Sequence, residues 1–268
     1  MRLIIKHNTH YHYDDAPKHL IQLLRLTPRL DAHQRMVDWR ISSPGKINGF
    51  TDAFGNLSHS HVLNTPQSDM NILVEGTVDL LPLIDGVIAT EENSQAVPTI
   101  AYMVPTSLTA GFAELDAFSR DVLPNGLSSG HDVLALATAI CSKIAYITGN
   151  TDVTSTAKQA FDQASGVCQD HAHVMIAACR SLGVSARYVS GYVDPGNSRE
   201  AASHAWVDVW LGAHWVSVDV TNSIFASDSH CRLAIGRDYL DACPIRGIRE
   251  GGLTEKLDVS VTVQTFQQ

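Results

Sequence analysis

The chain has 268 residues and a formal net charge of −9, with 44% hydrophobic and 18% charged residues. This composition can fill a core and excludes a compositionally disordered chain. The mean hydropathy is −0.01 and no apolar run approaches about 18 residues, so we expect no membrane-spanning helix and no membrane partner. The acidic pI near 5.7 argues against a nucleic-acid partner, which would need a basic face.

Five cysteines are present, and their spacing excludes a zinc ribbon because no Cys-x-x-Cys pair occurs. The odd number also argues against a disulfide framework. The first seven residues lack the apolar core of a signal peptide. We therefore expect a reduced, cytoplasmic protein. The cysteines are Cys141, Cys168, Cys179, Cys231 and Cys243.

Residues 1–95 are expected to form an antiparallel β-sandwich or barrel, because short apolar runs recur with turn signals between them. One of these signals, Asp52–Asn56, is interpreted as a turn. The expected strands cover residues 3–13, with a break before Asp14, and then residues 20–26, 36–41, 57–62 and 70–81.

Residues 96–107 contain Pro98 and Pro105 and are predicted to link the two units. The second unit, residues 108–268, has an α+β pattern of helices followed by an antiparallel sheet. A period near 3.6 predicts a helix over residues 131–144, and a second helix is expected to begin near residues 166–168 and to stop at Gly183. The strands expected after it cover residues 186–193, 204–211, 214–220 and 257–263.

Cys168 stands in the expected first turn of the second helix. Unpaired backbone N–H groups and the positive end of the helix dipole meet there. Both favour a thiolate over a thiol, and the thiolate is the nucleophile. Its placement points to a catalytic cysteine.

The register of the next hairpin brings a histidine and an aspartate together. Gly212 and Ala213 fit a two-residue turn between alternating runs. In that register Trp206 faces Asp219, so His204 and Asp219 are diagonal neighbours on one face, with Cα atoms roughly 7–8 Å apart. A slip of one residue would separate them to opposite faces.

Cys168, His204 and Asp219 therefore form a candidate Cys-His-Asp triad. His204 would exchange the proton of the thiol, and Asp219 would hold the imidazole in the useful tautomer. The N–H of Cys168 is a natural oxyanion donor. A second donor is required, and its candidates are Gln163, Gln169 and Trp206.

Four segments carry a family resemblance: residues 166–173 (GVCQDHAH), 186–192 (ARYVSGY), 203–207 (SHAWV) and 219–222 (DVTN). In this order they resemble the core of the bacterial transglutaminase-like superfamily. The β-rich first half, with Asp52–Asn56, resembles the N-terminal domain that often precedes that core. The resemblance implies a papain-like thiol fold with Cys168, His204 and Asp219 as its triad. One departure is Val220, where the family pattern has proline.

The function expected from the residues and the resemblance is amide-bond chemistry through a thioester on Cys168, without a cofactor. Hydrolysis of a peptide or isopeptide bond, in a peptide or protein substrate, is the first expectation. Transfer to an amine, which cross-links proteins, is the alternative among enzymes. A non-catalytic scaffold of the same fold is the alternative outside enzymes.

Other polar residues have simpler interpretations beside a functional one. His171 and His173 do not share a helix face, so no metal site is expected, although Cys168, His171 and His204 form a minor alternative. Asp170 is expected to complement the helix dipole. Arg237 is expected in a structural ion pair, with contact to substrate as the alternative, and Trp206 is the tryptophan expected to line the cleft.

Overall fold

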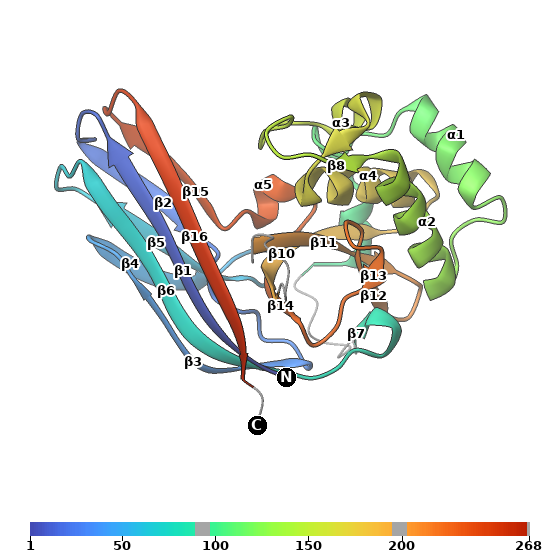
Figure 1. Cartoon of the computed structure of the whole chain (residues 1–268), viewed down its shortest axis with the longest axis horizontal. Coiled ribbons are helices and arrows are strands. Elements are labelled where there is room, and N and C mark those ends of the chain that lie inside the picture. Colours follow the sequence, from blue (N-terminus) through green and yellow to red (C-terminus); the bar gives the residue numbers. More distant parts are fainter. Residues whose placement is uncertain (89–96, 195–202, 267–268) are drawn as a thin grey trace.

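Two units lie side by side, a β-sandwich and a sheet covered by helices (Figure 1). The structure is a computed structural model that describes residues 1–88, 97–194 and 203–266. The α+β class and the antiparallel sheets expected from the sequence are confirmed.

Two four-stranded antiparallel sheets form the sandwich, with strand orders β16-β1-β6-β3 and β15-β2-β5-β4. Their strands are β1 (Arg2–Tyr13), β2 (His19–Leu24), β3 (Gln34–Ser42), β4 (Lys46–Thr51), β5 (Leu57–Leu63), β6 (Asp69–Leu80), β15 (Ile245–Glu250) and β16 (Glu255–Phe266).

Strand β1 contributes to two hydrophobic cores, one within the sandwich and one between the sandwich and the second unit. Its odd-numbered residues are all buried, which is the alternation of a strand with one covered face. Leu3 and Ile5 pack with Tyr192 and Leu233 of the second unit, whereas Tyr11 belongs to the core between the two sheets of the sandwich. One strand face therefore contributes to both cores.

The last two strands return to the sandwich instead of ending in the second unit. β16 pairs with β1 along its whole length, from Phe266 opposite Arg2 to Glu255 opposite Tyr13. The strand expected at residues 257–263 thus exists, but it lies outside the sheet of the second unit, where the predicted 108–268 boundary had placed it. Alternating apolar residues predict a strand and one covered face, yet they do not specify the partner strand.

The second unit is built on a sheet of order β13-β12-β11-β10-β14, with β7 paired to β12. Helix α4 packs against β10 and β11. A short parallel pair, β8 (Ala145–Tyr146) and β9 (Ser165–Gly166), lies apart from this sheet. The other elements are η1 (Ile84–Gly86), β7 (Val87–Ile88), α1 (Ala113–Val122), α2 (Gly130–Lys143), α3 (Ala157–Gln163), α4 (Cys168–Ser181), β10 (Ala186–Val193), β11 (Ser203–Trp210), β12 (Trp215–Asp219), β13 (Ile224–Phe225), β14 (His230–Gly236) and α5 (Tyr239–Ala242).

The described part of the expected linker is packed, not free; residue 96 lies outside the described residues. A short 3-10 helix, η2 (Thr99–Met103), carries Tyr102, which is 2% exposed. The Tyr102 ring meets Trp215 edge-on at 5.5 Å, and its carbonyl accepts a 2.6 Å hydrogen bond from Arg180 of α4. These contacts make the segment part of the second unit's core.

Strand β14 ends its sheet, and two side-chain amides from the sandwich unit cover its free edge. Gln34 exchanges two hydrogen bonds of 2.9 Å with the backbone N–H and carbonyl of Arg232. Asn56 does the same with Ile235, again at 2.9 Å for each bond. The expected turn at Asp52–Asn56 is present, since the Asp52 N–H donates to the Asn56 carbonyl. This turn also joins the two units.

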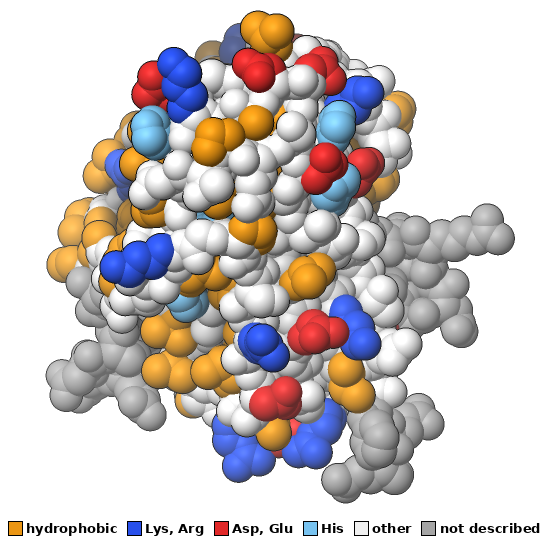
Figure 2. Space-filling view, turned by 90° about the vertical axis from the view of Figure 1, so that its left-hand side faces the viewer, with side chains coloured by type: hydrophobic (Ala, Val, Ile, Leu, Met, Phe, Trp, Pro, Cys, Tyr) orange, Lys and Arg blue, Asp and Glu red, His pale blue; other side chains and the backbone are white. Residues whose placement is uncertain are grey.

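The outer face of the sandwich carries acidic and basic side chains interspersed among apolar ones (Figure 2). On the face that is visible there, neither sign of charge forms a continuous field. Within the three described ranges, no helix has the length and apolar character needed to cross a membrane.

Candidate active site

Helix α4 begins at Cys168, as the sequence predicted, and the residues around it explain why. Asp170 is buried, and its carboxylate accepts hydrogen bonds from the Val167 N–H at 2.8 Å and from the Thr151 hydroxyl at 2.7 Å. Gly166 is needed here because a Cβ would lie 2.6 Å from the Cβ of Asp170. Asp170 thus caps the first turn of α4, and burial raises its pKa.

The inner face of α4 packs against β11 and β10. Ala172, Met175, Ile176 and Cys179 are fully buried, as their spacing predicted. Among the strands of the second unit, α4 contacts β11 most extensively. Cys168 itself is half-buried and is a free thiol.

The predicted register of the hairpin is confirmed. Val207 pairs with Val218 and Trp210 with Trp215, which places Trp206 opposite Asp219. The Leu211 N–H donates to the His214 carbonyl at 3.0 Å. The turn needs glycine at position 212, where φ is +83°.

This register brings His204 and Asp219 into contact. His204 Nε2 lies 2.8 Å from Asp219 Oδ2, and both side chains are almost fully buried. The Cys168 side chain also lies near His204, since it contributes to the raised pKa of that imidazole. Because Nε2 is engaged by the carboxylate, Nδ1 is the ring nitrogen left for the sulfur.

The electrostatics of this pair favour a charged imidazole. Burial by itself would lower the pKa of His204, but the hydrogen bonds and charges of Asp219 and Cys168 outweigh it and raise that pKa to about 10. Burial would likewise raise the pKa of Asp219, but His204 and His230 hold it well below its usual range. The arrangement therefore stabilises an imidazolium between a carboxylate and a sulfur.

The polar residues proposed to contact substrate or the oxyanion lie in different surroundings. Gln169 is buried, and its amide donates to the Asp152 carbonyl at 3.4 Å, so it is tied to a neighbouring loop. Gln163 ends α3 and is exposed. Arg237 forms the expected ion pair, 2.8 Å from Asp241.

Trp206 differs from its expected place at the cleft surface. Its side chain is fully buried, with the ring 6.3 Å from that of His204 and 5.2 Å from that of His230. Trp206 lies on the same strand face as His204, as predicted. Phe54 of the sandwich unit packs against this face, and the indole is therefore buried.

Two further residues bind the carboxylate of Asp219. Asn222 Nδ2 lies 2.7 Å from Oδ2, and the Asn222 N–H donates to Oδ1 at 3.2 Å. His230 Nε2 approaches Oδ2 at 3.2 Å. Asn222 could have been found from the sequence, since an asparagine three residues after an aspartate can turn back to it. His230 could not, because it begins β14, a strand with no recognised signal.

His171 and His173 are core residues. His171 Nε2 lies 3.0 Å from the Ile144 carbonyl and Nδ1 3.0 Å from the Thr221 hydroxyl, so both nitrogens are engaged away from Cys168. His173 Nε2 accepts from the Tyr239 N–H at 3.1 Å. The described residues contain no group of three or more His, Cys, Asp or Glu arranged to hold a metal ion.

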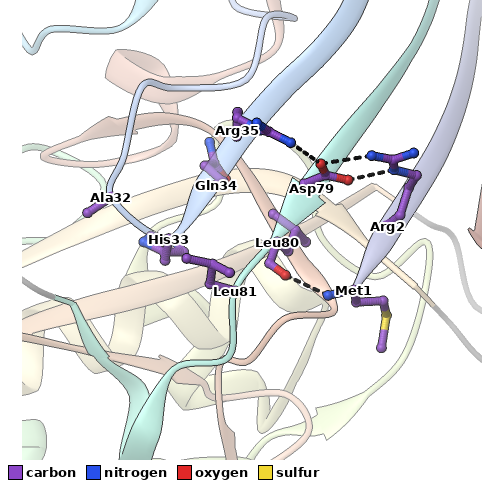
Figure 3. A pocket seen from close by; sticks show the side chains of 9 residues that line it. All are labelled: Met1, Arg2, Ala32, His33, Gln34, Arg35, Asp79, Leu80 and Leu81. Carbon is purple, nitrogen blue, oxygen red and sulfur yellow. Dashed lines mark hydrogen bonds and ion pairs between the residues drawn. The ribbon is translucent and has the colours of Figure 1, made fainter.

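A cavity of about 680 Å³ lies elsewhere, where the N-terminus meets β3 and β6 (Figure 3). An ion-pair network of Arg2, Asp79 and Arg35 crosses its rim. None of the candidate triad residues lines it. Its lining consists of Met1, Arg2, Ala32, His33, Gln34, Arg35, Asp79, Leu80 and Leu81.

A helix that begins at a cysteine and packs on an antiparallel sheet with a histidine and an aspartate defines a papain-like thiol fold. The chain belongs to the transglutaminase-like superfamily. Residues 116–220 match the Transglutaminase-like superfamily, and residues 3–79 match the Bacterial transglutaminase-like N-terminal region. The resemblance inferred from the sequence is confirmed.

Two relatives and one solved structure are similar to this chain over nearly its whole length. An uncharacterised protein of Mycobacterium leprae is 30% identical, with 98% of each chain covered. An uncharacterised protein of Mycobacterium tuberculosis is also 30% identical, over 99% of this chain and 93% of the other. The fold matches that of a proposed cysteine protease from Cytophaga hutchinsonii with a TM-score of 0.77 and 19% identity, covering 100% of this chain and 92% of that one.

Proposed function

We propose that this protein is a thiol hydrolase of peptide or isopeptide bonds, with Cys168 as nucleophile, His204 as general base and acid, and Asp219 as the group that orients His204. The observation that carries the proposal is the 2.8 Å contact of His204 Nε2 with Asp219, which leaves the other ring nitrogen for Cys168. The superfamily supports thiol-dependent chemistry in general.

The reaction begins when the Cys168 sulfur attacks the carbonyl carbon of the amide. The carbonyl electrons move to oxygen, where the N–H of Cys168 at the helix start is placed to stabilise them. The C–N bond then breaks, and the leaving amine takes its proton from His204. The product of this half is a thioester on Cys168.

Water completes the cycle in the hydrolytic route. His204 removes a proton from water, the oxygen attacks the thioester, and the carboxylic acid leaves as the sulfur is released. No step needs a cofactor. A reducing compartment such as the cytoplasm would keep Cys168 available as a thiol.

Amine transfer differs only in the second half, where a primary amine replaces water. The discriminating experiment is a screen of peptide and glutamine-containing amides with and without an added primary amine. Release of acid that is unchanged by the amine supports hydrolysis. An amide adduct that replaces the acid product would instead identify an acyltransferase.

The nucleophile is tested by iodoacetamide labelling of the whole chain, with each cysteine followed by peptide mass spectrometry. The matched control is Cys141, which is also half-buried but donates to the Thr221 carbonyl at 3.2 Å. We expect Cys168 to react at least about tenfold faster than Cys141 at pH 6. Equal rates for these two thiols would favour the scaffold alternative, as would full turnover by Cys168→Ala.

A further inference from the structure

The carboxylate of Asp219 is shared by two imidazoles. His204 Nε2 and His230 Nε2 approach the same oxygen, Oδ2, at 2.8 Å and 3.2 Å. Asp219 is fully buried and His230 is 2% exposed, so water does not compete for these contacts. The mechanism above uses only one of the two histidines.

The hydrogen bonds of His230 determine which of its nitrogens carries the proton. The backbone N–H of Ser227 donates to Nδ1 at 3.3 Å, and the Ser229 hydroxyl lies 3.0 Å from the same nitrogen. A backbone N–H can only donate, so Nδ1 is an acceptor. Nε2 therefore bears the hydrogen and donates it to Asp219.

The backbone and the neighbouring rings hold His230 in place. It pairs with Val193 at the start of β14, and its own N–H donates to the Ser227 carbonyl at 3.1 Å. The ring meets Trp206 edge-on at 5.2 Å, and Trp206 faces His204 on its other side. His230 from β14 and Trp206 and His204 from β11 thus surround the Asp219 carboxylate of β12.

We propose that His230 is a positioning residue, which holds the Asp219 carboxylate in the orientation that directs His204 at Cys168. The inference rests on the proposed function of that cysteine. Without His230, Oδ2 keeps only His204 and Asn222 as donors, and the carboxylate is held less firmly in its orientation. If the His204 ring turns together with the Asp219 carboxylate, it loses its alignment with the Cys168 sulfur.

The test compares three substitutions that differ in reach. His230→Gln keeps an amide N–H near the position of Nε2, His230→Asn retracts it, and His230→Leu removes it while filling the space. The measurement is the rate constant for iodoacetamide alkylation of Cys168 between pH 5 and pH 9. Circular dichroism and thermal unfolding identify which variants are folded.

At pH 6 we expect His230→Leu and His230→Asn to slow alkylation of Cys168 by about 10- to 100-fold, and His230→Gln to stay within about threefold of the wild type. Near pH 9 the rates should converge, because thiols ionise there without an imidazole partner. If His230→Leu does not fold, the Gln and Asn variants decide the comparison.

The outcomes separate this inference from the proposed function. If Cys168 in the wild type reacts no faster than Cys141, the proposed function fails. If wild-type Cys168 is fast but all folded His230 variants match it across the pH range, only the positioning role fails. A uniform loss in Gln, Asn and Leu variants alike, at every pH, also overturns the positioning role because it indicates general structural damage.

Discussion

The strongest prediction for stability concerns Asn56, whose side chain joins the sandwich to the edge strand β14 of the second unit. Asn56 is fully buried and exchanges two 2.9 Å hydrogen bonds with the backbone of Ile235. It also donates to Asp52 at 3.0 Å and accepts from the buried Arg29 guanidinium. Asn56→Ala removes all of these partners and leaves the Ile235 N–H and carbonyl unpaired.

The magnitude follows from the groups left unpaired. A buried polar group without its partner costs about 1–3 kcal/mol, and a lost partner of a charged group costs at the upper end. Two unpaired backbone groups and a weakened Arg29 site together imply a loss of about 3–5 kcal/mol in the free energy of unfolding. For a chain of this size each kcal/mol lowers Tm by about 2–4 °C, so we expect Tm to fall by about 6–20 °C.

Differential scanning calorimetry of the whole chain measures this effect. The matched control is Asn48→Ala, since Asn48 lies in strand β4 and is exposed. We expect the control to stay within about 2 °C of the wild type, because surface substitutions usually change stability by less than about 0.5 kcal/mol. A Tm for Asn56→Ala equal to that of the control would refute the argument that side-chain amides secure the edge of β14.

Three further predictions concern the site and its supports. The Asp219→Asn variant should fold but have a kcat at least about a thousandfold lower, because an amide at this position holds His204 in the wrong tautomer. Retained turnover in steady-state assays would count against the triad. A Cβ at Gly191 would overlap the Trp206 indole, so Gly191→Ala should lower the free energy of unfolding in urea by about 1–3 kcal/mol. The control is Gly49→Ala, where the atom nearest to the added Cβ lies at 3.5 Å and no overlap lowers the stability. The folded-state pKa of His204, about 10, lies above the roughly 6.5 of an exposed histidine, so its stabilising effect is complete below about pH 6.5 and is lost as the pH rises through 10. Tm should therefore fall more steeply between pH 6.5 and pH 10 in the wild type than in His204→Gln, and parallel curves would contradict this linkage.

Local sequence features were sufficient for the elements that hold the candidate triad. The start of α4 at Cys168 follows from Gly166 and Asp170, which are near in the chain. The diagonal placement of His204 and Asp219 follows from a two-residue turn and strict alternation along two neighbouring strands. Such constraints act between residues that are near in the chain, so they can be read from the residues alone.

Other elements had weaker local signals. Helices α1 and α3 were not predicted, although Thr156 and Gln159 form a capping box at the start of α3. Strand β4 is mostly exposed, and β14 is buried on both faces, so neither shows the alternation of a half-buried strand. In these cases the surrounding structure, not the pattern of the segment, determines the conformation.

The sequence by itself determined the class of fold, the start of α4 and the register that unites His204 with Asp219. Only the tertiary structure decided that β16 pairs with β1, that Trp206 is covered by the sandwich unit, and that His230 shares the Asp219 carboxylate. These features depend on contacts between segments far apart in the chain. A strand's pattern specifies which of its faces is buried, whereas the partner that buries it depends on how the whole chain packs.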